Sequence, residues 1–106
     1  MNSNANTKFI GQLDCKRSDL DFTWELKIDE EKEEVFIKHS DDKFYQYNFR
    51  SSLDDFYFSR SWVAKKMRHE FVINRMSGKF ETITTYDGAS KQFKFNGTCN
   101  KKERAF

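Results

Sequence analysis

The side chains with the most reactive chemistry in this chain are two histidines and two cysteines, and all four are far apart in the sequence. His39 and His69 each lie beside an expected turn, while Cys15 and Cys99 lie in the first and last expected strands. Zinc sites bring such residues together through short spacings such as C-x-x-C or H-x-x-x-H. A cysteine nucleophile needs a positioned base. Neither pattern occurs, so we expect no metal, no cofactor and two solvated histidines.

Acid–base catalysis and cation binding both use carboxylates. The chain has two pairs of adjacent aspartates, Asp41-Asp42 and Asp54-Asp55. Acid–base catalysis needs two carboxylates in unlike environments, one of them partly buried. Adjacent aspartates in turns are usually solvated alike. The acidic run at residues 29–34 lacks the glycine and the spacing of an EF-hand loop. We therefore expect a protein that is not an enzyme.

Aromatic rings interleaved with basic residues predict a binding surface instead. The densest aromatic runs are residues 44–49 and 56–62, and a basic cluster follows at residues 64–68. Tyr, Trp and Arg are the residue types enriched at the hot spots of protein interfaces. The side chains that we expect to contact a partner are Tyr57, Arg60, Trp62, Lys65, Lys66 and Arg68.

Three binding functions fit this chain. The first, which we favour, is a small non-enzymatic protein that engages a protein partner through surface aromatics and a basic patch. The second is a single-stranded nucleic-acid-binding β-barrel, in which rings stack on bases beside cations. The third is a small barrel that holds an apolar ligand, although large rings would tend to fill the interior of so short a barrel.

The charge of the chain is divided unevenly along its length. Residues 1–59 carry eight Lys/Arg and thirteen Asp/Glu, a net charge of −5, and residues 60–106 carry eleven and four, a net charge of +7. If the basic half forms one side of the molecule, it steers acidic partners toward that side. The alternative is that these charges are dispersed over a solvated surface.

Alternation of apolar and polar residues predicts the elements that position these side chains. From Leu20 to Ile28 every second residue is apolar, which is typical of a strand with one dry face and one wet face. This pattern places Trp24 in the core. Further strands are expected at residues 8–15, 34–39, 44–49, 55–62, 70–75, 80–86 and 91–99.

The expected fold is all-β, an antiparallel meander of about seven to eight strands that closes into a small barrel or a sandwich. Short turns join the strands, among them the turn with Gly78 and the Asp-Gly turn at residues 87–90. Residues 53–68 also fit a helical stripe, so a short helix within this segment is the alternative to a strand.

The chain of 106 residues supports one domain. We expect a flexible polar tail at residues 1–7, a β-domain at residues 8–100 and a basic tail at residues 101–106. The polar start lacks the apolar core of a secretory signal, and no apolar run is long enough to span a bilayer. These features favour a soluble cytoplasmic protein with reduced thiols. A disulfide is the alternative, since a closed sheet brings Cys15 and Cys99 together.

The C-terminal third carries a recognisable pattern. Residues 73–80 read Ile-Asn-Arg-Met-Ser-Gly-Lys-Phe, and residues 97–99 read Gly-Thr-Cys before a basic end that closes on Phe106. This pattern resembles small uncharacterised bacterial and phage-type β-proteins that share an I-[ND]-R-x-[ST]-G-x-[FL] hairpin, then G-x-C and a basic tail ending in Phe. Those proteins usually begin with an export signal, which residues 1–7 do not resemble. The resemblance implies a β fold and no activity.

Overall fold

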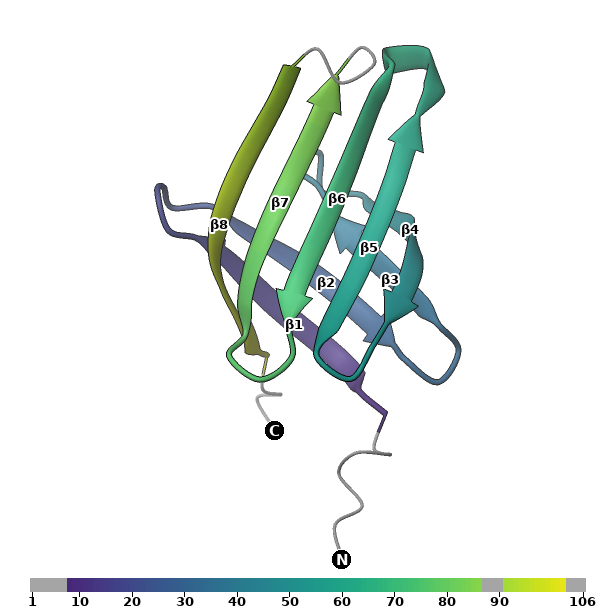
Figure 1. The fold of residues 1–106 in the computed structure, drawn as a ribbon, viewed down its shortest axis with the longest axis vertical. Coiled ribbons are helices and arrows are strands. Elements are labelled where there is room, and N and C mark those ends of the chain that lie inside the picture. Colours follow the sequence, from purple (N-terminus) through teal and green to yellow (C-terminus); the bar gives the residue numbers. More distant parts are fainter. Residues whose placement is uncertain (1–7, 87–90, 103–106) are drawn as a thin grey trace, which may run out of the picture.

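The computed structural model describes residues 8–86 and 91–102, which form eight antiparallel strands. Each strand pairs with the next along the chain, and the first pairs with the last, so the meander closes into a barrel (Figure 1). The predicted antiparallel β-barrel is therefore confirmed. The strands are β1 (Ile10–Arg17), β2 (Thr23–Asp29), β3 (Glu34–Lys38), β4 (Phe44–Ser51), β5 (Asp55–Trp62), β6 (Met67–Asn74), β7 (Lys79–Tyr86) and β8 (Lys91–Lys101).

The barrel has two different ends. Strands β5 to β8 stand close to the long axis of the molecule, and β1 to β4 cross behind them (Figure 1). A single turn of 3-10 helix, η2 (Val63–Lys65), connects β5 to β6 at one end, and the β6–β7 turn lies at the opposite end. The strand predicted at residues 55–62 is confirmed, and η2 is the only helical turn in the described part of the chain. None of the described helical residues forms a segment that could cross a membrane.

Alternate side chains of each strand fill the barrel, as the two-residue period predicts. In β2, Leu26 and Ile28 are buried, and Trp24 packs against the core from a partly buried position. Leu20 departs from the prediction, because it is 51% exposed. The pattern continues into the β1–β2 turn, where the N–H of Arg17 donates to the carbonyl of Phe22. The predicted strand from Leu20 therefore begins too early.

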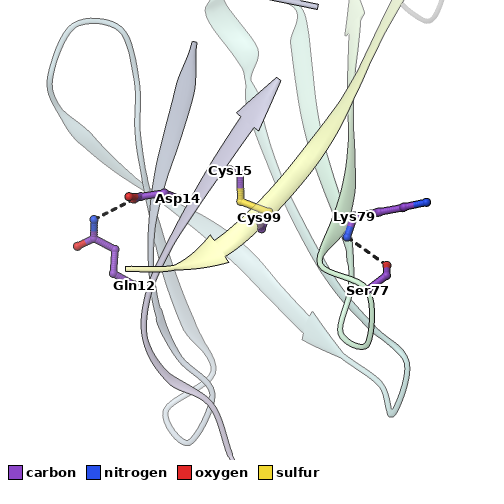
Figure 2. Close-up of a disulfide and its surroundings, with 6 residues drawn as sticks. All are labelled: Gln12, Asp14, Cys15, Ser77, Lys79 and Cys99. Carbon is purple, nitrogen blue, oxygen red and sulfur yellow. Dashed lines mark hydrogen bonds between the residues drawn. A yellow bond between two sulfur atoms is a disulfide. The ribbon is translucent and has the colours of Figure 1, made fainter. Parts of the chain in front are cut away.

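Strands β1 and β8 are joined by a covalent bond as well as by hydrogen bonds. Cys15 and Cys99 lie opposite each other in the register and form a disulfide (Figure 2). The expectation of reduced thiols is therefore wrong in this structure. Gly97 permits the same close approach, because a Cβ there would lie 1.9 Å from the carbonyl oxygen of Lys16 and 2.7 Å from the ring of Phe80.

The residues that carry the sequence resemblance build this closure. The side chain of Asn74 accepts hydrogen bonds from the N–H groups of Met76 and Ser77, at 3.0 and 2.9 Å, and so shapes the β6–β7 turn. Gly78 has a φ of 76°, a left-handed conformation that favours glycine. Its carbonyl accepts the N–H of Cys99 at 2.7 Å. The hairpin motif and the G-x-C motif are therefore parts of one structural unit.

A buried ion pair links two turns at the same end of the barrel. The guanidinium of Arg75 donates to both carboxylate oxygens of Glu30, at 2.8 Å each, and Glu30 is only 5% exposed. Arg75 also stacks on the ring of Phe56 and donates to the carbonyl of Ser52. The acidic run at residues 29–34 is thus more than a solvated connection, since one of its carboxylates holds this end together.

The predicted tails fall mostly beyond what the structure describes. Strand β8 ends at Lys101, the first residue of the expected basic tail, and the N–H of Lys102 donates to the carbonyl of Gln12. The tail predicted at residues 1–7, the turn at residues 87–90 and the rest of the basic tail, residues 103–106, lie outside the described residues.

Candidate functional site

The alternation of side chains along β5 divides the predicted contact residues between the two faces of the barrel wall. Phe56 and Phe58 are buried inside the barrel, and Arg60 and Trp62 continue the same face because residues two apart in a strand point the same way. Tyr57 points outward. Tyr57 and Arg60, two of the predicted contact residues, therefore lie on opposite faces of the wall.

Tyr57 belongs to a polar cluster on the outer wall. Its hydroxyl donates to the carboxylate of Glu70 on β6. The guanidinium of Arg68 lies 3.8 Å from that carboxylate and 3.4 Å from the Tyr57 hydroxyl, and it donates to Ser61 at 3.3 Å. Arg68 thus connects the outer wall to the end of β5.

Arg60 is held at the inner face of the barrel end. One of its terminal nitrogens, Nη1, donates to the carbonyl of Gln46 at 2.8 Å. Its guanidinium carbon lies 5.4 Å from the ring centroid of Tyr45 and 5.1 Å from that of Trp62. The Nε of Arg60 is buried and has no hydrogen-bond partner within residues 8–86 and 91–102. The geometry therefore leaves a positioned cation with an unused donor.

An open apolar hollow of about 360 Å³ lies beside η2, and we call it the rim groove. It contains three of the six predicted contact residues. It also contains Val63, an apolar residue that is 89% exposed. The sequence prediction missed Val63 and Met67, although Met67 interrupts the basic cluster at residues 64–68 and Val63 directly precedes it. The lining residues are Ser61, Trp62, Val63, Lys66, Met67, Arg68 and Thr85.

The rim groove has a basic border. Lys65 lies in η2, and Lys66 follows it in a left-handed conformation with a φ of 48° that turns the chain into β6. Neither lysine forms an ion pair with any residue that the structure describes. The groove therefore combines apolar walls with positive charge that no described acidic group neutralises.

Both histidines lie beneath this end of the barrel and share one hydroxyl. The Tyr47 hydroxyl is 2.9 Å from Nε2 of His39 and 2.5 Å from Nδ1 of His69. His69 is 5% exposed and follows the inner face of β6 with Phe71. The Trp24 ring packs against both imidazoles. The prediction of two solvated histidines is therefore wrong.

Burial keeps this hydrogen-bonded chain neutral. It lowers the pKa of His69 to about 4 and lowers the pKa of His39 as well, while it raises the pKa of the Tyr47 hydroxyl. Within residues 8–86 and 91–102, no three His, Cys, Asp or Glu side chains converge as metal ligands do. The arrangement is typical of a structural network, in which each buried polar group has a partner.

Comparison of the chain with protein-family models, with curated proteins and with solved structures found no match. Its function is therefore inferred from its own residues.

Proposed function

We propose that this protein is a small non-enzymatic binding module that engages a protein partner at the rim groove. The observation that carries the proposal is an open apolar hollow at the end of a filled barrel, where Val63 is almost fully exposed beside Trp62 and Met67. Exposed apolar surface with a polar border is characteristic of interaction sites. Trp and Arg are the residue types that contribute most to such interfaces.

The charge around the groove favours an acidic partner. Lys65 and Lys66 have no acidic neighbour among the described ion pairs, and Arg68 shares a single carboxylate, that of Glu70. These residues belong to the half of the sequence with a net charge of +7. A positive border raises the association rate of a partner with negative charge around its apolar contact residue.

The arrangement of the rings gives less support to binding of single-stranded nucleic acid. Base stacking needs a free aromatic face. The Trp62 ring packs against the rings of His39 and Tyr45, and the guanidinium of Arg60 lies over it. Tyr57 points away from Trp62 on the outer wall. The rings that the sequence grouped together therefore form no continuous stacking surface.

An apolar ligand inside the barrel is likewise less well supported. The interior is occupied by rings, with Phe58 and Phe71 fully buried and Phe56 and Phe80 nearly so. Pairs of these rings stack on one another. The rim groove lies at the end of the barrel and is open, which suits a side chain of a partner better than an enclosed ligand.

The cellular compartment of the protein does not favour one of these binding functions over another. The cytoplasmic location that we expect from the sequence rests partly on reduced thiols, whereas Cys15 and Cys99 are bonded in the structure. Disulfides persist mainly in oxidising compartments. Neither cysteine lines the rim groove, so the proposed interaction does not depend on the location.

Affinity capture with a matched pair of variants tests the proposal. Val63 and Met76 are 89% and 90% exposed and lie at opposite ends of β6. Val63→Asp places a negative charge in the rim groove, and Met76→Asp makes a comparable change at the far end. Immobilised native protein and Met76→Asp should retain the same partner from a lysate, as identified by mass spectrometry.

The affinity is then measured with the purified partner by calorimetry. Val63→Asp should weaken binding by tenfold or more, which corresponds to about 1.4 kcal/mol or more. Near-ultraviolet circular dichroism confirms that both variants keep the native fold. Equal affinities of Val63→Asp and Met76→Asp would place the interface elsewhere.

A further inference from the structure

Strand β8 has a neighbour on both sides over only part of its length. Residues 97–101 pair with β1 as well as with β7. Residues 91–96 pair with β7, and no other strand in the described part of the chain pairs with them. The carbonyl of Asn96 accepts the N–H of Ser18 at 2.9 Å, where the β1–β2 turn begins. Beyond this bond β8 is the outermost of strands β5 to β8 (Figure 1). The sheet therefore has an open edge at residues 91–95.

The alternation of the backbone shows which groups this edge offers. Successive residues of a strand direct their N–H and C=O groups to opposite neighbours. The N–H of Cys99 bonds to the residue that precedes β7, whereas the carbonyl of Asn96 bonds toward the β1 side. Odd-numbered residues of β8 therefore pair with β7. The N–H and C=O groups of Gln92 and Lys94 point the other way, where the structure describes no strand.

The side chains of this edge combine an exposed ring with positive charge. Phe93 follows the inner face with buried Cys99, but it is 48% exposed, and its ring centroid lies 5.8 Å from that of Tyr86. Lys94 is exposed on the outer face. Neither Lys91 nor Lys94 forms an ion pair with a residue that the structure describes. A strand laid along this edge meets a ring on one face and a cation on the other.

We propose that residues 91–96 of β8 bind an extended segment of a partner, which adds to the sheet as an antiparallel strand and has acidic residues alternating with apolar ones. Main-chain hydrogen bonds to an open edge supply the affinity of such complexes, and alternate side chains supply the specificity. Directly opposite residues of paired strands share a face. The apolar residues of the segment therefore lie beside Phe93, and the acidic residues beside Lys94. No residue of β8 lines the rim groove, so this surface is separate from the groove.

A second copy of this chain is the competing occupant of the edge. If two β8 edges paired about a two-fold axis at Lys94, each Lys94 would lie opposite its own copy. Like charges directly opposite each other destabilise a sheet. Lysines on an edge strand are also a common means of preventing self-association. Because the same lysines attract carboxylates, the charge of the edge favours an acidic segment over a second copy.

Amide hydrogen exchange of the 15N-labelled protein, followed by nuclear magnetic resonance, tests the edge. In the protein alone, the amides of Phe93 and Phe95 should exchange more slowly than those of Gln92 and Lys94. The probe is the blocked heptapeptide Glu-Val-Glu-Val-Glu-Val-Glu. It should shift the amides of residues 91–96 in a saturable manner and slow the exchange of Gln92 and Lys94. No saturable shift at residues 91–96 would overturn the inference.

Methylated forms of the peptide test the direction of its hydrogen bonds. In the proposed pairing the glutamates lie opposite Gln92 and Lys94, so the glutamate N–H groups face β8 and the valine N–H groups face away. Methylation of the glutamate nitrogens should weaken binding by tenfold or more, and methylation of the valine nitrogens should weaken it by less. Equal effects of the two methylations would contradict strand addition.

Matched variants test the role of charge. Lys94→Glu should weaken binding of the peptide by fivefold or more. Lys79→Glu makes the same change at an exposed position of β7 and should leave binding unchanged, and equal affinities of the two variants would contradict the acidic preference. Protection of Gln92 and Lys94 that grows with protein concentration in the absence of peptide would assign the edge to a second copy. Shifts at residues 91–96 with oligothymidylate but not with the peptide would assign it to phosphate. Either result would overturn the inference.

The failure of this inference can be told apart from the failure of the proposed function. Val63→Asp alters the rim groove and should bind the peptide as the native protein does. If Val63→Asp loses the peptide, the peptide binds in the groove and the edge site is wrong. If Val63→Asp binds both the peptide and the purified partner as the native protein does, the edge site stands and the proposed interface is wrong.

Discussion

The hydroxyl of Tyr47 lies 2.5 Å from Nδ1 of His69, and both side chains are buried in the barrel. The same hydroxyl is 2.9 Å from Nε2 of His39. Because the hydroxyl has a single hydrogen, Tyr47 donates to one imidazole and accepts the N–H of the other. The Tyr47 hydroxyl is therefore the hydrogen-bond partner of both imidazoles. Among the described residues, no other group forms a hydrogen bond with either ring.

Removal of that hydroxyl should destabilise the protein. Tyr47→Phe leaves a polar nitrogen of His69 buried without a partner, and we expect the free energy of unfolding to fall by about 1–3 kcal/mol. Urea denaturation measures the difference. Tyr45→Phe is the matched control on the same face of β4, because the Tyr45 hydroxyl bonds to exposed Asp41. This variant should lower the free energy of unfolding by less than Tyr47→Phe does. Equal losses in the two variants would contradict a buried network.

Stability should depend on pH through His69. The unfolded chain protonates this histidine near pH 6.5, whereas burial lowers its pKa to about 4 in the folded protein. Between these values the unfolded state binds more protons, so the free energy of unfolding falls as the pH is lowered. The lowered pKa of His39 acts in the same direction.

The expected loss between pH 7 and pH 5 is about 2 kcal/mol, measured by urea denaturation at constant ionic strength. His69→Gln removes the titrating group and should make the profile flatter over the same range. A native protein that is equally stable at pH 7 and pH 5 would show that His69 is not held neutral by burial.

Gly97 should be intolerant of a side chain. A Cβ there would lie 1.9 Å from the carbonyl oxygen of Lys16, so β1 and β8 would have to separate. We expect Gly97→Ala to lower the free energy of unfolding by about 3 kcal/mol. Gly11→Ala is the control, because its Cβ would lie 3.4 Å from the ring of Phe9, an ordinary contact. Similar denaturation midpoints for the two variants would contradict the close approach at Gly97.

The disulfide should account for a large part of the stability. Cys15 and Cys99 are separated by 84 residues in the sequence, and a cross-link over a loop of that length stabilises by about 4–5 kcal/mol in the chain-entropy model. Reduction should lower the free energy of unfolding accordingly. Ellman's reagent should find no free thiol in the unreduced, denatured protein. Two free thiols per chain in that sample would contradict the bond.

The period of the sequence predicted the strands because burial imposes it directly. β5 occupies Asp55–Trp62, as predicted, since its even-numbered residues face the core. The same pattern failed at Leu20, where the chain turns between β1 and β2. Alternation of apolar and polar residues indicates which side chains face the core. It does not show where a strand stops pairing with its neighbour. Boundaries therefore depend on turn hydrogen bonds such as that from Arg17 to Phe22.

The functional site was predicted less well than the strands, although the two-residue alternation contained part of the missing information. Tyr57 and Arg60 are an odd number of residues apart, which assigns them to opposite faces, and His69 shares its face with buried Phe71. The sequence prediction grouped residues by their closeness in sequence. It therefore separated neither Tyr57 from Arg60 nor His69 from the solvated side chains. The pairing of Cys15 with Cys99 does not follow from the two-residue period, because it depends on the register of the first and last strands. No local pattern contains that register.

The amide spectrum of the 15N-labelled protein, recorded with and without the purified partner, shows whether a protein partner binds at the rim groove. Binding at the groove should broaden or shift the amides of residues 61–68 and of Thr85, and leave those of the β6–β7 turn, residues 74–79, unchanged. Changes concentrated at residues 74–79, or on the outer faces of β2 to β4 with residues 61–68 unaffected, would contradict the proposed interface.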